Sequence, residues 1–395
     1  MLEPVAGGNG PPRAFLRVGG MTVARQQLAL AQTLQCERIV CLAQGMRPEL
    51  IELQHAAEAA GAKFHVIGGP RSLLGLVTAA DELIVLGDGL FASTRDAASL
   101  LEQGQAVLVQ PIEQGLAAGF ERIDLNHAAA GAMRIPGRLV EQIAELAPEC
   151  DAASALQRLA LQAGVRQRPI PSADNAQVFW TLLSSEEQAH ALEPLWVRQR
   201  TGTDTPLGPS QAIALLAVRQ FGPALLHAGS GAGHVAIGAA LLAAIGLGTG
   251  WLGSASLGLA LCAFGWILRQ CAVLLTRIDG RARPTGRALG SDLAYGLLLD
   301  IVLVVLSGWG VASVPWQHAG ERFFPAFMLV ALLRIVPRIM PGRWTAWLED
   351  RALLATGLAT AVASGAGGEL IHAAAVVAAV AGIALSGLAS RLTRP

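Results

Sequence analysis

The sequence predicts two parts of different fold class, an α/β domain in the first half and an all-α membrane domain of six helices in the second. Three observations predict this division. The chain has 395 residues, of which 53% are hydrophobic and only 15% are charged, whereas a soluble domain has about 25% charged residues. Charged residues are scattered as far as about Arg200 and become rare after about Ser210. Short apolar runs alternate with helical patterns before this point, and long apolar runs follow it.

The composition excludes two classes of protein. Basic and acidic residues balance at 29 each, and a chain without excess positive charge is not expected to bind nucleic acid. The hydrophobic content excludes a disordered chain. Only one basic residue is a lysine, Lys63, so a phosphate site elsewhere must use arginine or backbone amides. The five cysteines lack metal-ligand spacing and are expected to be reduced thiols.

The alternation of strands and helices in the first half is typical of an α/β domain with a largely parallel sheet. We assign residues 1–170 to this domain, 171–208 to a connector with prolines near its ends, and 209–395 to the membrane domain. The predicted strands are 38–42, 64–67, 83–86 and 106–109, and the predicted helices are 22–35, 48–61, 71–80 and 94–103.

Two features of the α/β domain are candidates for nucleotide binding. Gly19-Gly20 precedes the first predicted helix, where backbone amides can hold a phosphate; the alternative is an ordinary turn. Asp88 follows the strand 83–86, and ligands of such sheets bind beyond the carboxyl ends of the strands. A carboxylate at this place can hold a divalent metal against a nucleotide phosphate, and the alternative is a turn aspartate.

The order of these features resembles the Rossmann-like nucleotidyltransferase fold, whose members attach CMP or GMP to sugar or polyol phosphates. In that family a glycine-rich loop with a basic residue opens the domain, and an aspartate follows the fourth strand. Residues 121–124 and 131–133 resemble the later product-side region. Around Gly19-Gly20 the sequence lacks the family's Gly-x-Gly-x-Arg and its following lysine. The resemblance implies a nucleotide site made of Gly19, Gly20, Arg25 and Asp88.

The second half contains six apolar runs of roughly 18 or more residues, the length at which a helix spans a membrane. Their immediate succession disfavours the alternative, a buried helical bundle of a large soluble protein. Segment 209–228 is apolar but interrupted by polar residues, and we interpret it as an interfacial helix. The predicted spans are 232–251, 253–275, 289–312, 324–341, 351–367 and 370–389.

Arginines gather in alternate loops of the membrane domain. They follow the second, fourth and sixth predicted spans, at Arg277, Arg281, Arg283, Arg287, Arg338, Arg343, Arg351, Arg391 and Arg394. By the positive-inside rule the arginine-rich side is cytoplasmic. We therefore expect a multi-pass protein of the cell (inner) membrane whose N-terminal domain and C-terminus both face the cytoplasm. The first twenty residues lack the apolar segment of a cleavable signal peptide.

The stretch from Thr276 to Asp300 carries the strongest candidate site. Asp292, Gly296 and Asp300 are spaced by four and share one helix face, and ionisable residues at membrane depth are usually functional. Together with Asp279, these carboxylates would suit a hard divalent cation, and the neighbouring arginines would hold a phosphate. The alternative for the arginines is topology and attraction to lipid head groups.

This stretch resembles the CDP-alcohol phosphatidyltransferase family. The family pattern is Asp-x-x-Asp-Gly-x-x-Ala-Arg, eight residues, and then Gly-x-x-x-Asp-x-x-x-Asp. Asp279-Gly280 and Ala282-Arg283 match it with one residue deleted between them, and Asp300 then matches the last aspartate. Thr276 and Gly296 stand at the other two aspartate positions, and Asp292 stands at the family's glycine.

The resemblance implies a chemistry and a set of residues. Family members transfer a phosphoalcohol from a CDP-alcohol to an alcohol acceptor with Mg²⁺ or Mn²⁺, and they form homodimers. Asp279 and Asp300 would be the metal ligands, and Asp292 would be a ligand or a general base. The implied substrate-binding and phosphate-binding residues are Gly280, Arg281, Ala282, Arg283 and Arg287.

The two halves together resemble the bifunctional inositol-phosphate enzymes, which make CDP-inositol and transfer its phosphoinositol group. Three functions stay open. The first is a phosphoalcohol transferase of phospholipid or polyol-phosphodiester synthesis. The second is a catalytically degenerate relative that acts as a membrane anchor, partner or regulatory subunit, which the missing motif residues of both halves favour. The third is a small transporter, with which the glycine-rich spans are compatible.

Overall fold

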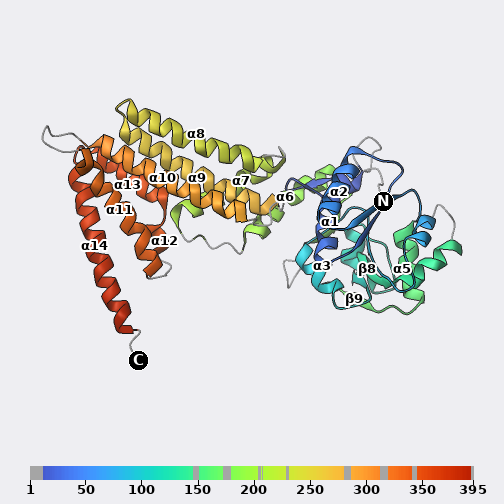
Figure 1. Cartoon of the computed structure of the whole chain (residues 1–395). Helices are drawn as coiled ribbons and strands as arrows, with labels where there is room; N and C mark the ends of the chain where they lie inside the picture. Colours follow the sequence, from blue (N-terminus) through green and yellow to red (C-terminus); the bar gives the residue numbers. More distant parts are fainter. Residues whose placement is uncertain are drawn as a thin grey trace. The chain divides into compact units, whose positions relative to one another are not determined.

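The computed structural model describes residues 12–145, 151–171, 179–202, 206, 208–227, 231–279, 286–311, 319–339 and 345–392. The chain separates into two compact units, Met1–Trp196 and Val197–Pro395. The first unit is an α/β unit and the second is helical (Figure 1). The coarse prediction of two fold classes is therefore confirmed.

The N-terminal unit is built around a mixed sheet in the order β5-β8-β7-β9. β8 (His127–Pro136) runs antiparallel to both β5 (Glu82–Leu86) and β7 (Ala106–Pro111), while β9 (Gln167–Pro169) is parallel to β7. A separate parallel pair consists of β3 (Arg38–Leu42) and β4 (Lys63–Ile67). The four predicted strands are confirmed, but the prediction of a largely parallel sheet is wrong, because β8 inserts between β5 and β7.

Helices cover both faces of this sheet. Leu108, Ala130 and Ala132 pack with Leu101 of α3 on one face, and the opposite face packs against η3 and α5 through Val107, Ile135, Leu139 and Leu156. The helices are η1 (Arg13–Phe15), α1 (Val23–Thr33), α2 (Pro48–Ala59), η2 (Pro70–Gly75), α3 (Thr94–Leu101), α4 (Ile112–Ala117), η3 (Gly137–Glu145) and α5 (Ala152–Gln162).

Local sequence signals explain where most of these helices begin. The Thr22 hydroxyl caps α1, the Asp151 carboxylate caps α5, and Pro48 opens α2. The predicted helix 71–80 is wrong beyond Gly75, where the observed 3₁₀ helix ends. Asp81 then accepts hydrogen bonds from the Thr78 amide and hydroxyl, which closes a turn in place of further helix.

Part of the expected connector 171–208 is folded. β10 (Trp180–Leu182) pairs antiparallel with β6 (Leu90–Ala92), and α6 (Glu186–Thr201) follows. Phe91, Phe179 and Trp196 form an edge-to-face aromatic cluster with ring centroids 4.9–5.6 Å apart. This cluster attaches β10 and α6, as far as Trp196, to the rest of the α/β unit.

The C-terminal unit consists of helices throughout the part of the chain that the structure describes. They are α7 (Pro209–His227), α8 (Gly231–Trp251), α9 (Ala255–Asp279), α10 (Gly286–Gly310), α11 (Ala319–Ile339), α12 (Thr345–Leu348), α13 (Arg351–Ala363) and α14 (Gly367–Leu392) (Figure 1). Among the described residues, four segments are long and apolar enough to cross a membrane: Gly231–Trp251, Ala255–Ile278, Asp292–Gly310 and Gly367–Ala384. Four of the six predicted spans are therefore confirmed as candidate membrane helices.

The remaining two predicted spans fall on α11 and α13. α11 contains Glu321, Arg322, Arg334 and Arg338, so its charge sets it apart from the four apolar segments. α13 has 13 residues and is therefore about 20 Å long, shorter than the roughly 30 Å hydrocarbon core. The count of six spans stays a prediction.

Glycines allow α8 and α9 to approach closely, and the two helices lie side by side in Figure 1. A Cβ atom on Gly258 would lie 2.4 Å from the Gly246 carbonyl oxygen, and one on Gly246 would lie 2.7 Å from the Gly258 oxygen. Only glycine fits at such a crossing, which is a common way for membrane helices to pack. Gly253, with φ +95°, makes the turn between them.

Candidate functional site

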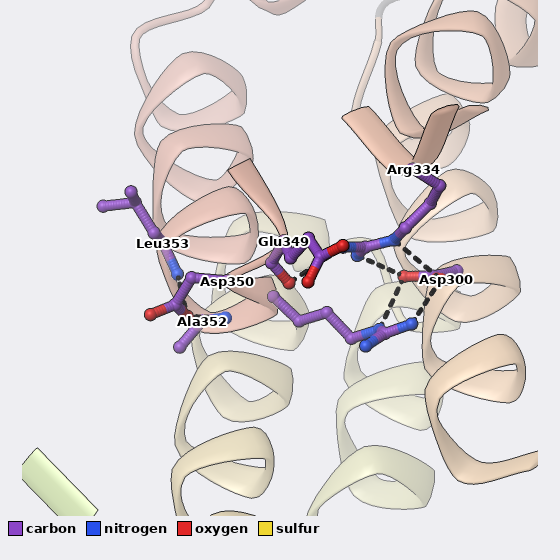
Figure 2. Close-up of polar contacts among 7 residues, drawn as sticks. Asp300, Arg334, Glu349, Asp350, Ala352 and Leu353 are labelled. Carbon is purple, nitrogen blue, oxygen red and sulfur yellow. Dashed lines mark hydrogen bonds and ion pairs between the residues drawn. The ribbon is translucent and has the colours of Figure 1, made fainter. Parts of the chain in front are cut away.

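The helical unit contains an ion-pair network in which Asp300 of α10 is bound by two arginines. Its Oδ1 accepts hydrogen bonds from Arg334 Nη2 at 2.8 Å and from Arg351 Nε at 2.9 Å. Its Oδ2 accepts from Arg334 Nε at 3.1 Å and from Arg351 Nη2 at 2.9 Å. Asp300 is 7% exposed, so two arginines neutralise a buried carboxylate. Figure 2 shows the Arg334 and Asp300 side chains facing each other.

Gly296 makes room for one of these arginines. It lies one turn before Asp300 on α10, and a Cβ atom there would lie 2.8 Å from Arg351 Nη2. Any larger residue would push the guanidinium away from its carboxylate. Gly296, which stands at an aspartate position of the family pattern, therefore provides the space that the Arg351 guanidinium occupies.

The chain just before α13 holds the network in place. Arg334 Nη1 donates to the Glu349 carbonyl oxygen at 2.8 Å. Asp350 caps α13 by accepting from the Ala352 and Leu353 amides at 3.0 and 3.3 Å (Figure 2). The other Asp350 oxygen accepts from the Ser210 amide at the start of α7, at 2.7 Å. Asp300 thus links α10, α11 and α13, and Asp350 links α13 to α7.

A stack of side chains continues the network across α9 and α10. The Arg351 guanidinium lies 4.7 Å from the centre of the Trp266 ring, and this ring stacks on Tyr295 with centroids 6.3 Å apart and planes 12° apart. The Arg269 guanidinium carbon lies 5.4 Å from the centre of the Tyr295 ring. Arg269 also forms an ion pair with Asp292. Cation–π contacts and stacking of this kind add to the ion pairs at both ends.

The arrangement does not fit a divalent cation at Asp300. A carboxylate has about four acceptor sites, and four guanidinium N–H groups already occupy those of Asp300. Asp292 is likewise paired with Arg269. Among the described residues, no group of three His, Cys, Asp or Glu side chains is placed to hold a metal ion. Asp292 and Asp300, two of the three acids predicted for one site, are each bound to arginine.

The remaining residues of the predicted membrane site lie mostly outside the described part of the chain. Asp279 is the last residue of α9 and Arg287 lies in the first turn of α10, but their side chains are outside the described residues. Gly280, Arg281, Ala282 and Arg283 also lie outside them.

In the N-terminal unit, Gly19-Gly20 is the turn of a two-residue hairpin between β1 (Arg17–Val18) and β2 (Met21–Thr22). Both glycines have positive φ, +60° and +81°, as this turn requires. The Gly19 amide donates to the buried Glu193 carboxylate at 3.3 Å. A carboxylate thus occupies one amide that was predicted to hold phosphate. The Arg25 amide donates to the Thr22 hydroxyl in the helix cap.

Asp88 lies in the turn between β5 and β6. Gln27 of α1 fixes this turn by donating to the Gly87 and Leu90 carbonyl oxygens at 2.9 and 3.0 Å. Burial raises the pKa of the nearby Cys41 thiol, and the Asp88 charge raises it further. Asp88 thus follows the carboxyl end of β5, in the turn that leads to β6.

Sequence reasoning missed the cationic and aromatic half of the network: Trp266, Arg269, Tyr295, Arg334 and Arg351. A signal was present, because Arg269 and Arg334 interrupt predicted spans, just as Asp300 does. Opposite charges on separate apolar helices are expected to pair, since an unpaired charge in hydrocarbon is costly. Arg269 and Arg334 could therefore have been predicted to pair with the aspartates of the same membrane domain.

The chain's own residues carry the evidence for function. No family model matches the sequence, and no curated protein matches it. The contacts of Asp292 and Asp300 with arginines are the strongest chemical observation in the helical unit.

Proposed function

We propose that this chain is a catalytically degenerate membrane relative of the CDP-alcohol phosphatidyltransferases that acts as a membrane anchor, partner or regulatory subunit. One observation carries the proposal: both oxygens of Asp300 are bound by Arg334 and Arg351. The acid that best matches the family's last aspartate thus stabilises the helix bundle.

Phosphoalcohol transfer of the family type requires carboxylates that are free to hold a metal. Releasing Asp300 from its partners would leave Arg334 and Arg351 partly buried without their counter-charge, and breaking a buried ion pair costs about 3–5 kcal/mol. Asp292 is similarly paired with Arg269. Thr276 and Gly296, at the other two aspartate positions, supply no carboxylate. Each of these points supports loss of the metal chemistry.

The second candidate is the active transferase, which the Asp279-Gly280 and Ala282-Arg283 pairs favour. In that case Asp279 and Asp300 would bind Mg²⁺ or Mn²⁺ after the arginines swing away. Asp292 would serve as ligand or base, and Arg281, Arg283 and Arg287 would bind the phosphates of a CDP-alcohol. The N-terminal unit would supply or regulate the nucleotide-activated substrate.

The proposed setting is the inner membrane, with six spans, a cytoplasmic N-terminal unit and a homodimeric assembly. The exposed side chains of α7 support an interfacial position for this helix. Ala214, Leu215 and Val218 are buried, and the helix packs against α9, whereas Ile213, Leu216 and Phe221 are 50–66% exposed. An apolar face turned away from the bundle suits the boundary between head groups and acyl chains.

Release of CMP separates the two candidates. The full chain in mild detergent is incubated with CDP-diacylglycerol and CDP-inositol, Mg²⁺ or Mn²⁺, and a mixture of polyol and lipid alcohols. We expect CMP release no greater than that of an Asp279→Ala/Asp300→Ala variant. An Asp279→Asn variant with Asp300 intact is the control that keeps the ion-pair network.

Two outcomes decide the matter. Release by the unmodified chain that is at least tenfold above the Asp279→Asn control overturns the degenerate assignment and supports the transferase. Equal background release by all three proteins, with the unmodified chain still monodisperse on size exclusion, supports the degenerate assignment. The size-exclusion measurement ensures that lack of activity does not reflect unfolding.

A further inference from the structure

The helical unit contains an apolar groove that none of its described helices fills. The groove has a volume of about 560 Å³ and lies between α11, α12, α13 and α14. Leu329, Leu358 and Ile371 form its buried floor, while Leu353 and Leu370 at its walls are 46% and 48% exposed. It is separate from the acidic residues of the candidate site, apart from Asp350 at one end.

The groove follows α13 for the length of that helix. Its lining runs from Asp350, the cap of α13, to Ser364 just beyond the last turn. The fourteen residue steps from Asp350 to Ser364 correspond to about 21 Å of helix.

These dimensions select the kind of occupant. An α-helix is about 10–12 Å across, so a helical segment of this length would need at least about 1,600 Å³. A groove of about 560 Å³ therefore cannot enclose a helix of a partner protein or of a second copy. A single extended hydrocarbon chain, whose carbon atoms pack about 3.5–4.0 Å from their neighbours, needs far less space than a helix.

The polar groups that line the groove are already satisfied. The Thr360 hydroxyl donates to the Gly357 carbonyl oxygen at 2.8 Å, and the Ser364 hydroxyl donates to the Ala361 oxygen at 2.7 Å. The Asp350 carboxylate accepts from the Ser210, Ala352 and Leu353 amides. A polar ligand would have to compete with these bonds, whereas an apolar ligand loses nothing.

Gly357 marks the open part of the groove. It lines the groove, and a Cβ atom placed on it would meet no atom within 4 Å. At one end, Trp347 is 57% exposed beside Asp350, and tryptophan is enriched where a membrane meets water. The groove is thus amphipathic at the end formed by Trp347 and Asp350 and largely apolar along the rest of α13.

We propose that this groove binds one acyl chain of a membrane phospholipid. The four apolar helices of the same unit support a bilayer as its surroundings, so phospholipid is the apolar chain present at highest concentration. The chain lies along α13, with the head group at the Trp347 and Asp350 end. The proposal rests on membrane embedding and is independent of whether the chain retains transferase activity.

Photo-crosslinking tests this proposal. The full chain is reconstituted in vesicles of phosphatidylethanolamine and phosphatidylglycerol at 3:1, with a trace of phosphatidylethanolamine that carries a diazirine on one acyl chain. Adducts are located by peptide mass spectrometry. We expect them to concentrate on the groove-lining peptides of α11, α13 and α14, above the yield on the exposed face of α8.

Gly357→Leu places a side chain in the groove and is expected to lower groove adducts at least fivefold, with a smaller decrease for Gly357→Ala. Gly248→Leu is the matched control, because Gly248 of α8 also has open space around it and does not line the groove. Leucine favours a helix over glycine by about 1 kcal/mol, so both variants are expected to fold, and size exclusion checks this.

Three results would overturn the proposal. The first is an adduct yield on α8 equal to that on the groove. The second is an unchanged groove yield in both Gly357 variants. The third is stronger groove labelling by diazirine-palmitic acid than by the phospholipid probe at equal concentration, which would assign the groove to free fatty acid.

Discussion

The two units place opposite kinds of side chain on their surfaces. In the N-terminal unit the ion pairs Arg38–Asp81 and Arg134–Glu82 lie on the surface, while Val107 and Ile135 are buried. In α10 of the helical unit, Leu293 and Ile301 are 65% and 64% exposed while Asp300 is 7% exposed. Each unit sorts its residues against a different solvent, water in the first and hydrocarbon in the second.

The same contrast changes the importance of an ion pair. An exposed pair such as Arg38–Asp81 contributes about 0–1 kcal/mol, because water and salt screen it. Breaking a buried pair leaves an uncompensated charge and costs about 3–5 kcal/mol. Removing one partner from the network around Asp300 is therefore expected to destabilise the chain far more than removing one partner of a surface pair.

The largest predicted effect is that of Asp300→Ala. This substitution leaves Arg334 and Arg351 partly buried without their carboxylate and is expected to destabilise the helical unit by about 3–5 kcal/mol. Thermal unfolding of the full chain in detergent, followed by size exclusion, measures the loss.

The control for this prediction is Asp81→Asn in the N-terminal unit, which removes the charge of the exposed Arg38–Asp81 pair, keeps a side-chain oxygen for the Thr78 turn and is expected to leave thermal unfolding nearly unchanged. A triple variant, Asp300→Leu with Arg334→Leu and Arg351→Leu, removes all the charges and is expected to recover much of the lost stability. If Asp300→Ala unfolds at the same temperature as the unmodified chain, the network has no structural role.

A smaller effect is predicted for an arginine on the exposed apolar surface. Leu241 is 56% exposed at the middle of the apolar segment Gly231–Trp251, and an arginine at the centre of a membrane helix costs about 2.5–3.5 kcal/mol. Leu241→Arg is therefore expected to lower the fraction of chain that resists alkaline extraction from membranes. Leu125→Arg, at a position 79% exposed in the N-terminal unit, is expected to leave it unchanged.

Equal behaviour of these two arginine variants would contradict the difference in solvent between the units. If both are extracted equally, the exposed leucines of α8 face water or another protein surface.

The smallest predicted effect concerns the exposed turn at Asp124. Hydrogen bonds from the Asn126 amide and from the His127 side chain and amide lower the pKa of Asp124 from 3.8 to about 2. Since the folded pKa lies below the unfolded one, Asp124 contributes stability at neutral pH, and this contribution is lost as the pH falls from about 4 through 2.

Carboxyl ¹³C shifts of the aspartate-labelled full chain measure this pKa. Asp124→Asn assigns the resonance. It is expected to remove one low-pKa transition and the part of the pH dependence of stability between about pH 4 and 2 that Asp124 supplies. A midpoint near 3.8 for Asp124 would show that the turn does not form in solution.

Local sequence patterns predicted the strands β3, β4, β5 and β7, because short runs of branched apolar residues favour strands wherever they occur. They did not predict β8, whose sequence His-Ala-Ala-Ala-Gly-Ala-Met-Arg-Ile-Pro is rich in alanine, the best helix former. β8 becomes a strand because β5 and β7 pair with it on both sides, and its neighbours are not adjacent to it in the sequence.

The candidate site divides in the same way. The sequence alone determined that the second half is apolar enough for a membrane and that Asp300 is an unusual charge within it, because both follow from residue types along one segment. Only the tertiary structure decided the partners of Asp300, since Arg334 and Arg351 lie 34 and 51 residues away. A buried carboxylate must find its counter-charge wherever the packing of helices brings one, and that packing depends on contacts among many segments at once.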